Sequence, residues 1–97
     1  MKVQKLAHDS LSTSFLVWVK KNVRAHRHKF HSENLYVIEG VGEMVVAKDT
    51  FNIGSGSYVF IPTNKVHSVR VDESNGVMTV LSIQSPFFDG NDWVFDE

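Results

Sequence analysis

Apolar and polar residues alternate at intervals of two along most of this chain, and this pattern restricts the folds open to it. Such alternation places apolar side chains on one face of a β-strand, whereas an amphipathic helix needs intervals of three and four. Strands are predicted over Val3–Leu6, Ser14–Lys20, Arg24–His28, Asn34–Glu39, Gly42–Ala47, Tyr58–Ile61, Val66–Val71 and Val77–Gln84. Many short strands separated by turns that contain Gly, Pro and Asn predict an all-β barrel or sandwich.

The length of 97 residues predicts one domain spanning 1–97. Hydrophobic residues make up 42% of the chain, which is enough for one compact core. A domain this small still leaves much of its surface wet and is often reinforced by a further element. Because the chain has no cysteine, a disulfide cannot be this reinforcing element. A metal ion and a subunit interface remain as candidates.

The charge pattern argues against two classes of partner. The formal net charge is -1, and the basic stretch Lys20–Lys29 is interpreted as a solvated strand edge, so no nucleic-acid partner is expected. The start of the chain lacks the apolar core of a secretory signal. The longest apolar run, Phe15–Val19, is too short to cross a bilayer. We therefore expect no membrane association and a cytoplasmic location.

Two segments raise the question of a partner subunit. Between Leu35 and Ile38 the residues of both faces are apolar, so both faces of this strand should be covered. This motivates the hypothesis of a homodimer. The tail, Ser85–Glu97, mixes four aromatic with four acidic residues and is expected to pack as an irregular arm. Its sequence does not decide between its own barrel and a neighbouring subunit.

Four residues are expected to face the barrel interior and to bind one divalent metal ion. His26 and His28 lie two apart, so on a strand both imidazoles point to one face. Glu33 begins a row continued by apolar residues, and an inward carboxylate is costly unless it is paired or bound to a metal. His67 shares its predicted face with two valines. Each residue alone is weak evidence, because a single inward histidine is more often hydrogen-bonded in a core.

For other polar residues near this set, an ordinary structural role explains the sequence at least as well as a functional role. His31 could assist the site or replace a ligand, but an exposed loop histidine is the favoured interpretation. Arg24 could hold an anionic substrate at the barrel mouth, or it could be a solvated residue at a strand end. Tyr58 is a weak candidate for a hydroxyl in a pocket.

The spacing of these residues resembles the two motifs of the cupin superfamily. The first motif appears as His26-Arg27-His28, four residues, Glu33, six residues and Gly40. The glycine that usually precedes it is Lys20 here. The second motif appears as Gly56, five residues, and then Pro62-Thr63-Asn64-Lys65-Val66-His67. Asn64 replaces a glycine, and asparagine tolerates the left-handed backbone expected at that position. Val71 stands where the motif ends in asparagine.

This resemblance to small, single-domain bacterial, RmlC-like cupins implies a double-stranded β-helix, or jelly roll. It also implies that His26, His28, Glu33 and His67 are metal ligands. Three imidazoles and one carboxylate suit Fe, Mn, Ni, Co or Zn as the divalent ion. The site would act on a small molecule, since small cupins of this type are similar to dioxygenases, isomerases and decarboxylases.

Two other functions stay open. The chain could be a non-catalytic module that binds a small ligand or sugar, or the metal could serve only to hold a small barrel together. An accessible pocket beside the metal site would favour catalysis or binding, whereas a mouth closed by the aromatic tail would favour a structural ion. The fold by itself does not choose among these functions.

Overall fold

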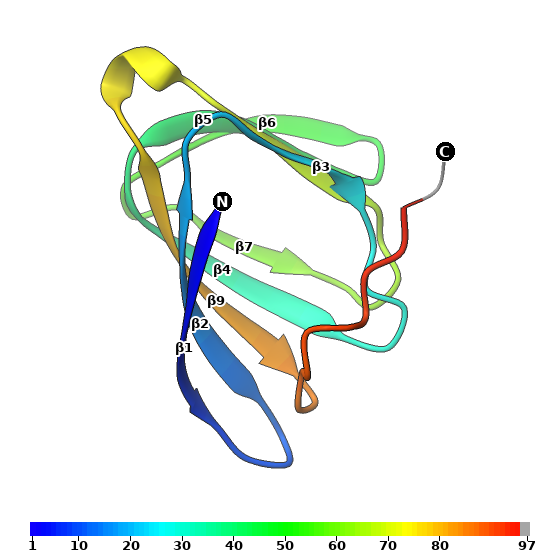
Figure 1. Ribbon diagram of the computed structural model, residues 1–97. Helices are drawn as coiled ribbons and strands as arrows, with labels where there is room; N and C mark the ends of the chain where they lie inside the picture. Colours follow the sequence, from blue (N-terminus) through cyan, green and yellow to red (C-terminus); the bar gives the residue numbers. More distant parts are fainter. Residues whose placement is uncertain (96–97) are drawn as a thin grey trace.

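Two antiparallel β-sheets face each other and enclose the interior of this protein (Figure 1). The computed structural model describes residues 1–95. Its strands are β1 (Lys2–His8), β2 (Thr13–Val19), β3 (Asn22–His26), β4 (Ser32–Glu39), β5 (Val41–Val46), β6 (Asp49–Gly54), β7 (Tyr58–Ile61), β8 (His67–Val71) and β9 (Met78–Ser85). One sheet has the order β1-β2-β9-β4-β7 and the other the order β3-β8-β5-β6. The predicted all-β jelly roll is therefore confirmed.

Helical structure is confined to one short turn in the described part of the chain. A 3-10 helix, Glu73–Asn75, lies in the connection between β8 and β9 and is capped by Asp72, which accepts a hydrogen bond from the Ser74 N–H. No helix within residues 1–95 has the length and apolar character needed to cross a membrane.

One strand escaped the sequence prediction, which assigned none to residues 49–54. β5 and β6 form a hairpin in which Val46 pairs with Asp49, so only Ala47 and Lys48 lie in the turn. Ala47 adopts a positive φ of 52°. Hairpin turns of two residues usually take this conformation at Asn or Gly, and neither is present here. The turn therefore carried no recognisable signal, although Phe51 and Ile53 alternate with polar residues as a strand requires.

The hydrophobic core lies between the two sheets and is built from the inward positions of both. Val37, Met44, Ile61 and Met78 are almost completely inaccessible to solvent. Gly42 permits this packing, because a Cβ there would lie 2.7 Å from the Arg70 carbonyl oxygen and 2.8 Å from the Met78 methyl group. The close approach of β5 to β8 and β9 thus depends on a residue without a side chain.

The outer face of the five-stranded sheet is apolar and open. On β4, Leu35 and Val37 are buried, whereas Tyr36 and Ile38 are 46% and 44% exposed. On β7, Tyr58 and Phe60 are 63% and 52% exposed on the same outer side. We expected both faces of β4 to be covered. Within the single chain, only its inner face is covered. Tyr58 points away from the interior and donates a hydrogen bond to Asn34, so the idea that it supplies a pocket hydroxyl was wrong.

Candidate metal centre

The four candidate ligands come together at one end of the barrel. His26 ends β3, His67 begins β8, and these two residues pair across the four-stranded sheet. Glu33 lies at the start of β4 in the opposite sheet, and His28 lies in the loop between β3 and β4. All four are buried, with exposed fractions between 3% and 8%. Sequence reasoning therefore placed each of them correctly in the interior.

Their mutual distances suit a shared ion. One nitrogen from each of His26, His28 and His67 lies within 4.8 Å of the other two. The Glu33 Oε1 atom lies 3.5 Å from His28 Nε2 and 3.4 Å from His67 Nε2. Three borderline nitrogen donors thus lie together, with the Glu33 carboxylate beside two of them, and this is a set of donors suited to a divalent transition metal.

Backbone carbonyls orient all three imidazoles in the same way. The Nδ1 atoms of His26 and His67 face the carbonyl oxygens of Arg24 and Lys65, at 2.6 Å and 2.9 Å. His28 Nδ1 faces the Asp92 carbonyl oxygen at 2.7 Å. A carbonyl can only accept, so each Nδ1 carries the proton and donates it. Each Nε2 therefore faces away from its carbonyl and can bind a metal once any proton on it is displaced, and the second nitrogen of a metal-binding histidine is commonly fixed in this manner.

The protonation of the cluster fits the same role. Burial would raise the pKa of Glu33, but hydrogen bonds from His28, His67 and Ser82 outweigh it and lower that pKa to about 2. Burial lowers the pKa of His26 to about 4. For His28 burial acts in the same direction, but the hydrogen bonds to Glu33 and to the Asp92 carbonyl outweigh it, so its pKa is raised. Near neutral pH the centre thus contains one carboxylate and an uncharged His26.

The C-terminal arm, residues 86–95, covers this end of its own barrel (Figure 1). Asp92 accepts hydrogen bonds from the backbone N–H groups of Lys29 and Phe30, both at 2.8 Å, and from His31 Nδ1 at 2.5 Å. The Trp93 ring lies against the His26 ring, with centroids 4.3 Å apart and planes 33° apart. The arm therefore holds both the loop that carries His28 and the ring of His26.

Two residues that the sequence left ambiguous are placed by this arm. His31 is not part of the ligand cluster, and its two ring nitrogens face Asp92 and, at 2.8 Å, the Phe87 carbonyl oxygen. Arg24 is exposed, and its guanidinium lies 4.3 Å from the centroid of the Phe95 ring. A bulge between Val23 and His26 shifts the register of β3, so Arg24 does not share the inward direction of His26.

The turns around the centre behave as their sequence predicted. Asn64, in the place of the motif glycine, has a φ of 70°, which confirms the expected left-handed conformation. Its N–H donates to the His28 carbonyl oxygen at 2.8 Å, so the turn before His67 is tied to the loop of His28. Gly40 and Gly56 also have positive φ, at 99° and 90°. These backbone conformations connect the strands that bring the ligands together.

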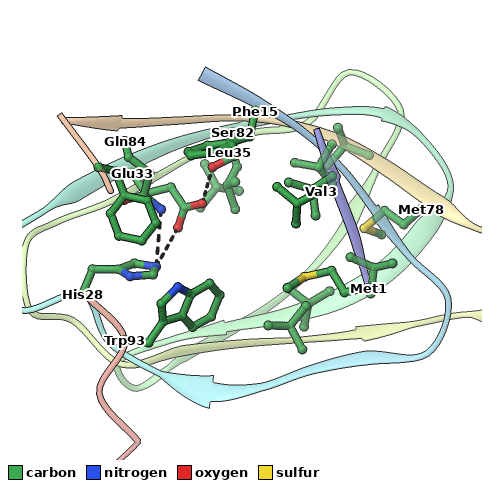
Figure 2. A pocket seen from close by; sticks show the side chains of 18 of the residues that line it. Met1, Val3, Phe15, His28, Glu33, Leu35, Met78, Ser82, Gln84 and Trp93 are labelled. Atoms are coloured by element: carbon green, nitrogen blue, oxygen red, sulfur yellow. Dashed lines mark hydrogen bonds and ion pairs between the residues drawn. The ribbon is translucent and has the colours of Figure 1, made fainter. Parts of the chain in front are cut away.

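A cavity of about 300 Å³ extends from the candidate centre into the barrel. His28 and Glu33 line it at the polar end, together with Ser82 and Gln84 of β9, while Met1, Val3 and Met78 lie at the far end (Figure 2). Sequence reasoning missed Ser82 and Gln84. The signal was present, because Met78, Val80, Ser82 and Gln84 form one alternating row that turns polar towards the end where Gln84 pairs with Glu33.

The structure is thus a small two-sheet β-barrel with a candidate metal centre, formed by three histidines and a glutamate, at one end. The family model for the cupin domain matches residues 15–84, and the chain belongs to this family.

Similarity to individual proteins is more distant. A quercetin 2,3-dioxygenase from Bacillus subtilis (strain 168) is 32% identical over 66 residues, which cover 65% of this chain and 20% of that enzyme. The chain thus spans about a fifth of the length of the curated relative that it matches.

Solved structures agree on the fold. KdgF from Halomonas sp. superimposes with a TM-score of 0.81 at 20% identity, covering 90% of this chain and 79% of that one. A variant of Streptomyces PAC13, solved with uridine, gives 0.80 at 17% identity, covering 94% and 72%. An RmlC-like cupin from Shewanella frigidimarina NCIMB 400 gives 0.77 at 22% identity, covering 87% and 74%.

Proposed function

We propose that this cupin binds one divalent metal ion through His26, His28, His67 and Glu33, and that it is a metal-dependent enzyme acting on a small molecule. The observation that carries the proposal is the shared orientation of the three imidazoles. Each Nδ1 donates to a backbone carbonyl, which leaves each Nε2 available for the ion.

The residues present fit such an ion. The donors are three imidazole nitrogens and one carboxylate oxygen, a set suited to Fe(II), Mn(II), Co(II), Ni(II) or Zn(II). The low pKa of Glu33 keeps its carboxylate charged, and the low pKa of His26 keeps its ring uncharged at neutral pH. Both are the states that metal binding requires.

The cavity supports action on a small molecule rather than a purely structural ion. When bound, the metal would act as a Lewis acid that polarises an oxygen atom of the substrate. The arm closes one end of the barrel, but His28 and Glu33 also line the cavity, so a ligand within it can reach the centre. Similarity to a protein named quercetin 2,3-dioxygenase makes dioxygenase chemistry the first reaction to test, ahead of isomerisation and decarboxylation.

Oxygen consumption by metal-loaded protein tests this function. Protein reconstituted separately with Fe(II), Mn(II), Co(II) and Ni(II) would be assayed with catechols and small enolisable acids. We expect consumption or product formation with at least one metal, and its loss in His67→Ala. His8→Ala is the matched control, because His8 is exposed and lies outside the cluster. Activity retained in His67→Ala would contradict the metal-dependent function.

A non-catalytic ligand-binding role is the second candidate, and the same cavity supports it. The Streptomyces PAC13 variant was solved with uridine, so a small molecule can accompany a cupin barrel of this shape. Metal-dependent ligand binding without any turnover of catechols or enolisable acids would favour this role. It would leave the proposed ligand set unchanged.

We further propose that two copies of the chain pair through the outer face of the five-stranded sheet. Tyr36 lies beside Tyr58 on one side and Leu81 on the other, and Phe60 lies beside Asn34. These neighbours form one largely apolar surface, and contiguous patches of this kind on small proteins commonly mark association sites. In such a dimer, each subunit would bury the outer-face residues of the other, which a single chain leaves exposed.

A further inference from the structure

Gln84 stands out among the polar residues of the barrel interior, because its side chain is buried and incompletely paired. It is 3% exposed and lines the cavity next to the candidate centre. Among the residues that the structure describes, its Oε1 is the buried side-chain polar atom without a hydrogen-bond partner. Leaving such an atom unpaired destabilises a fold, and β9 could carry an apolar residue here as it does at Val80.

The amide of Gln84 lies beside His28 and presents its nitrogen to that ring. Gln84 Nε2 lies 3.4 Å from His28 Nε2. The amide oxygen has no hydrogen-bond partner and is left as an unused acceptor at the polar end of the cavity, which Gln84 lines.

The rest of the cavity wall has the opposite character. Lys5 and Asp89 also line the cavity, but most of its wall is formed by aliphatic side chains from both sheets, among them Val17, Leu35, Met44 and Ile53. A hydroxyl group buried among them would lose its water contacts and gain no partner. Polyhydroxylated ligands such as sugars are therefore disfavoured here. The volume of about 300 Å³ lies at the lower end of the range for small-molecule sites.

We propose that Gln84 Oε1 is the specificity-determining acceptor of this site. The ligand it selects is small and largely apolar, and has one polar end that binds the metal through oxygen and carries a hydrogen-bond donor. The donor satisfies Oε1, while the apolar body fills the aliphatic part of the cavity. This inference rests on the proposed metal site but adds a chemical class of ligand to it.

Two hydroxamic acids separate the contribution of Gln84 from that of the metal. Benzohydroxamic acid chelates a metal through its two oxygens and keeps an N–H donor, whereas N-methylbenzohydroxamic acid chelates in the same way without that donor. Both would be titrated into Co(II)-loaded protein by calorimetry and by the visible spectrum of the ion. We expect wild type to prefer the N–H compound by about tenfold.

The Gln84→Leu variant is the decisive comparison. It should bind both compounds equally, so that the tenfold preference disappears. The metal-free variant should be as stable as wild type or more stable, since the substitution removes an unpaired buried atom. A preference that persists in Gln84→Leu, or that is absent from wild type, would overturn the role of Gln84 while leaving the metal site intact. Protein that takes up no Co(II) would overturn the metal site and this inference together.

The apolar part of the ligand has its own test. Wild type should bind benzohydroxamic acid more tightly than acetohydroxamic acid, which lacks the ring. Val17→Phe, which fills part of the cavity, should selectively weaken the binding of benzohydroxamic acid. It should thereby reduce the difference in affinity between the two hydroxamic acids. D-xylose should not compete with either compound. Equal affinity for the two hydroxamic acids in wild type, or displacement by D-xylose, would contradict an apolar ligand.

Discussion

The imidazole of His28 is held by the backbone carbonyl of Asp92, at a distance of 2.7 Å between residues that are 64 positions apart. The same residue receives the N–H groups of Lys29 and Phe30 on its carboxylate. One arm residue thus fixes both the loop and the ring of a candidate ligand. Burial would raise the pKa of Asp92, but the hydrogen bonds from His31, Phe30 and Lys29 outweigh it and lower that pKa.

Asp92→Ala should therefore weaken metal binding without removing a ligand. The loop that carries His28 would lose three hydrogen bonds, and the arm would pack less firmly. Because the backbone carbonyl that accepts from His28 remains, we expect Co(II) affinity to fall by about tenfold, at the lower end of the effects seen for partners of metal-bound histidines. Stability in urea should fall by about 1–3 kcal/mol. Asp49→Ala, an exposed carboxylate on β6, is the control and should change neither quantity.

The two tryptophans should report on the centre differently. Trp93 lies on the His26 ring, whereas Trp18 lies on β2 with the Lys2 ammonium 5.1 Å from its ring centroid. A paramagnetic ion such as Co(II) should therefore quench Trp93 fluorescence far more than Trp18 fluorescence. Trp18→Phe should keep the quenching and Trp93→Phe should lose it. Equal quenching in the two variants would place the ion away from His26.

Protonation of His28 should make metal affinity depend on pH. A metal at Nε2 must displace any proton there. The pKa of His28 is raised above 6.5, whereas burial lowers that of His26 to about 4. As the pH falls below the raised pKa of His28, affinity should fall by about tenfold per pH unit, and His26 should add to this only near pH 4. Unfolding measured at each pH controls for loss of the fold. A metal affinity that stays the same from pH 8 to pH 5 would contradict the assignment of His28 as a ligand.

The outer sheet face predicts the oligomeric state. Light scattering at micromolar concentration should give twice the 11.0 kDa mass of one chain. Phe60→Glu, at a position 52% exposed, should shift the protein towards monomer with little loss of stability. The control is Glu43→Gln, on the four-stranded sheet. A clean monomer mass for wild type would contradict pairing through this face.

Residue spacing predicted much of the site, because alternation along a strand determines which side chains point inward. His26, Glu33 and His67 each lie on or at the end of a strand, where this rule applies. The contributions of Asp92 and Trp93 could not be predicted in the same way. The arm has no regular structure, and its path depends on contacts with the barrel that no local pattern encodes.

Two further features show where local reasoning stops. The β5–β6 hairpin turns at Ala47, whose positive φ is imposed by the pairing of the flanking strands rather than favoured by the residue. Gln84 looked like an ordinary polar strand residue. Its importance depends on its pairing with Glu33 across β4 and β9, a register that the sequence alone did not provide.

Metal titration of the ligand variants tests the central claim most directly. Metal-free protein would be titrated with Co(II), and the bound metal would then be counted by elemental analysis after dialysis. The account predicts one ion per chain in wild type and in His8→Ala, and an affinity more than about a hundredfold lower in His67→Ala and His26→Ala. Glu33→Gln should also weaken binding, because it removes the only carboxylate among the proposed ligands. Binding of one ion by His67→Ala with wild-type affinity would contradict the account.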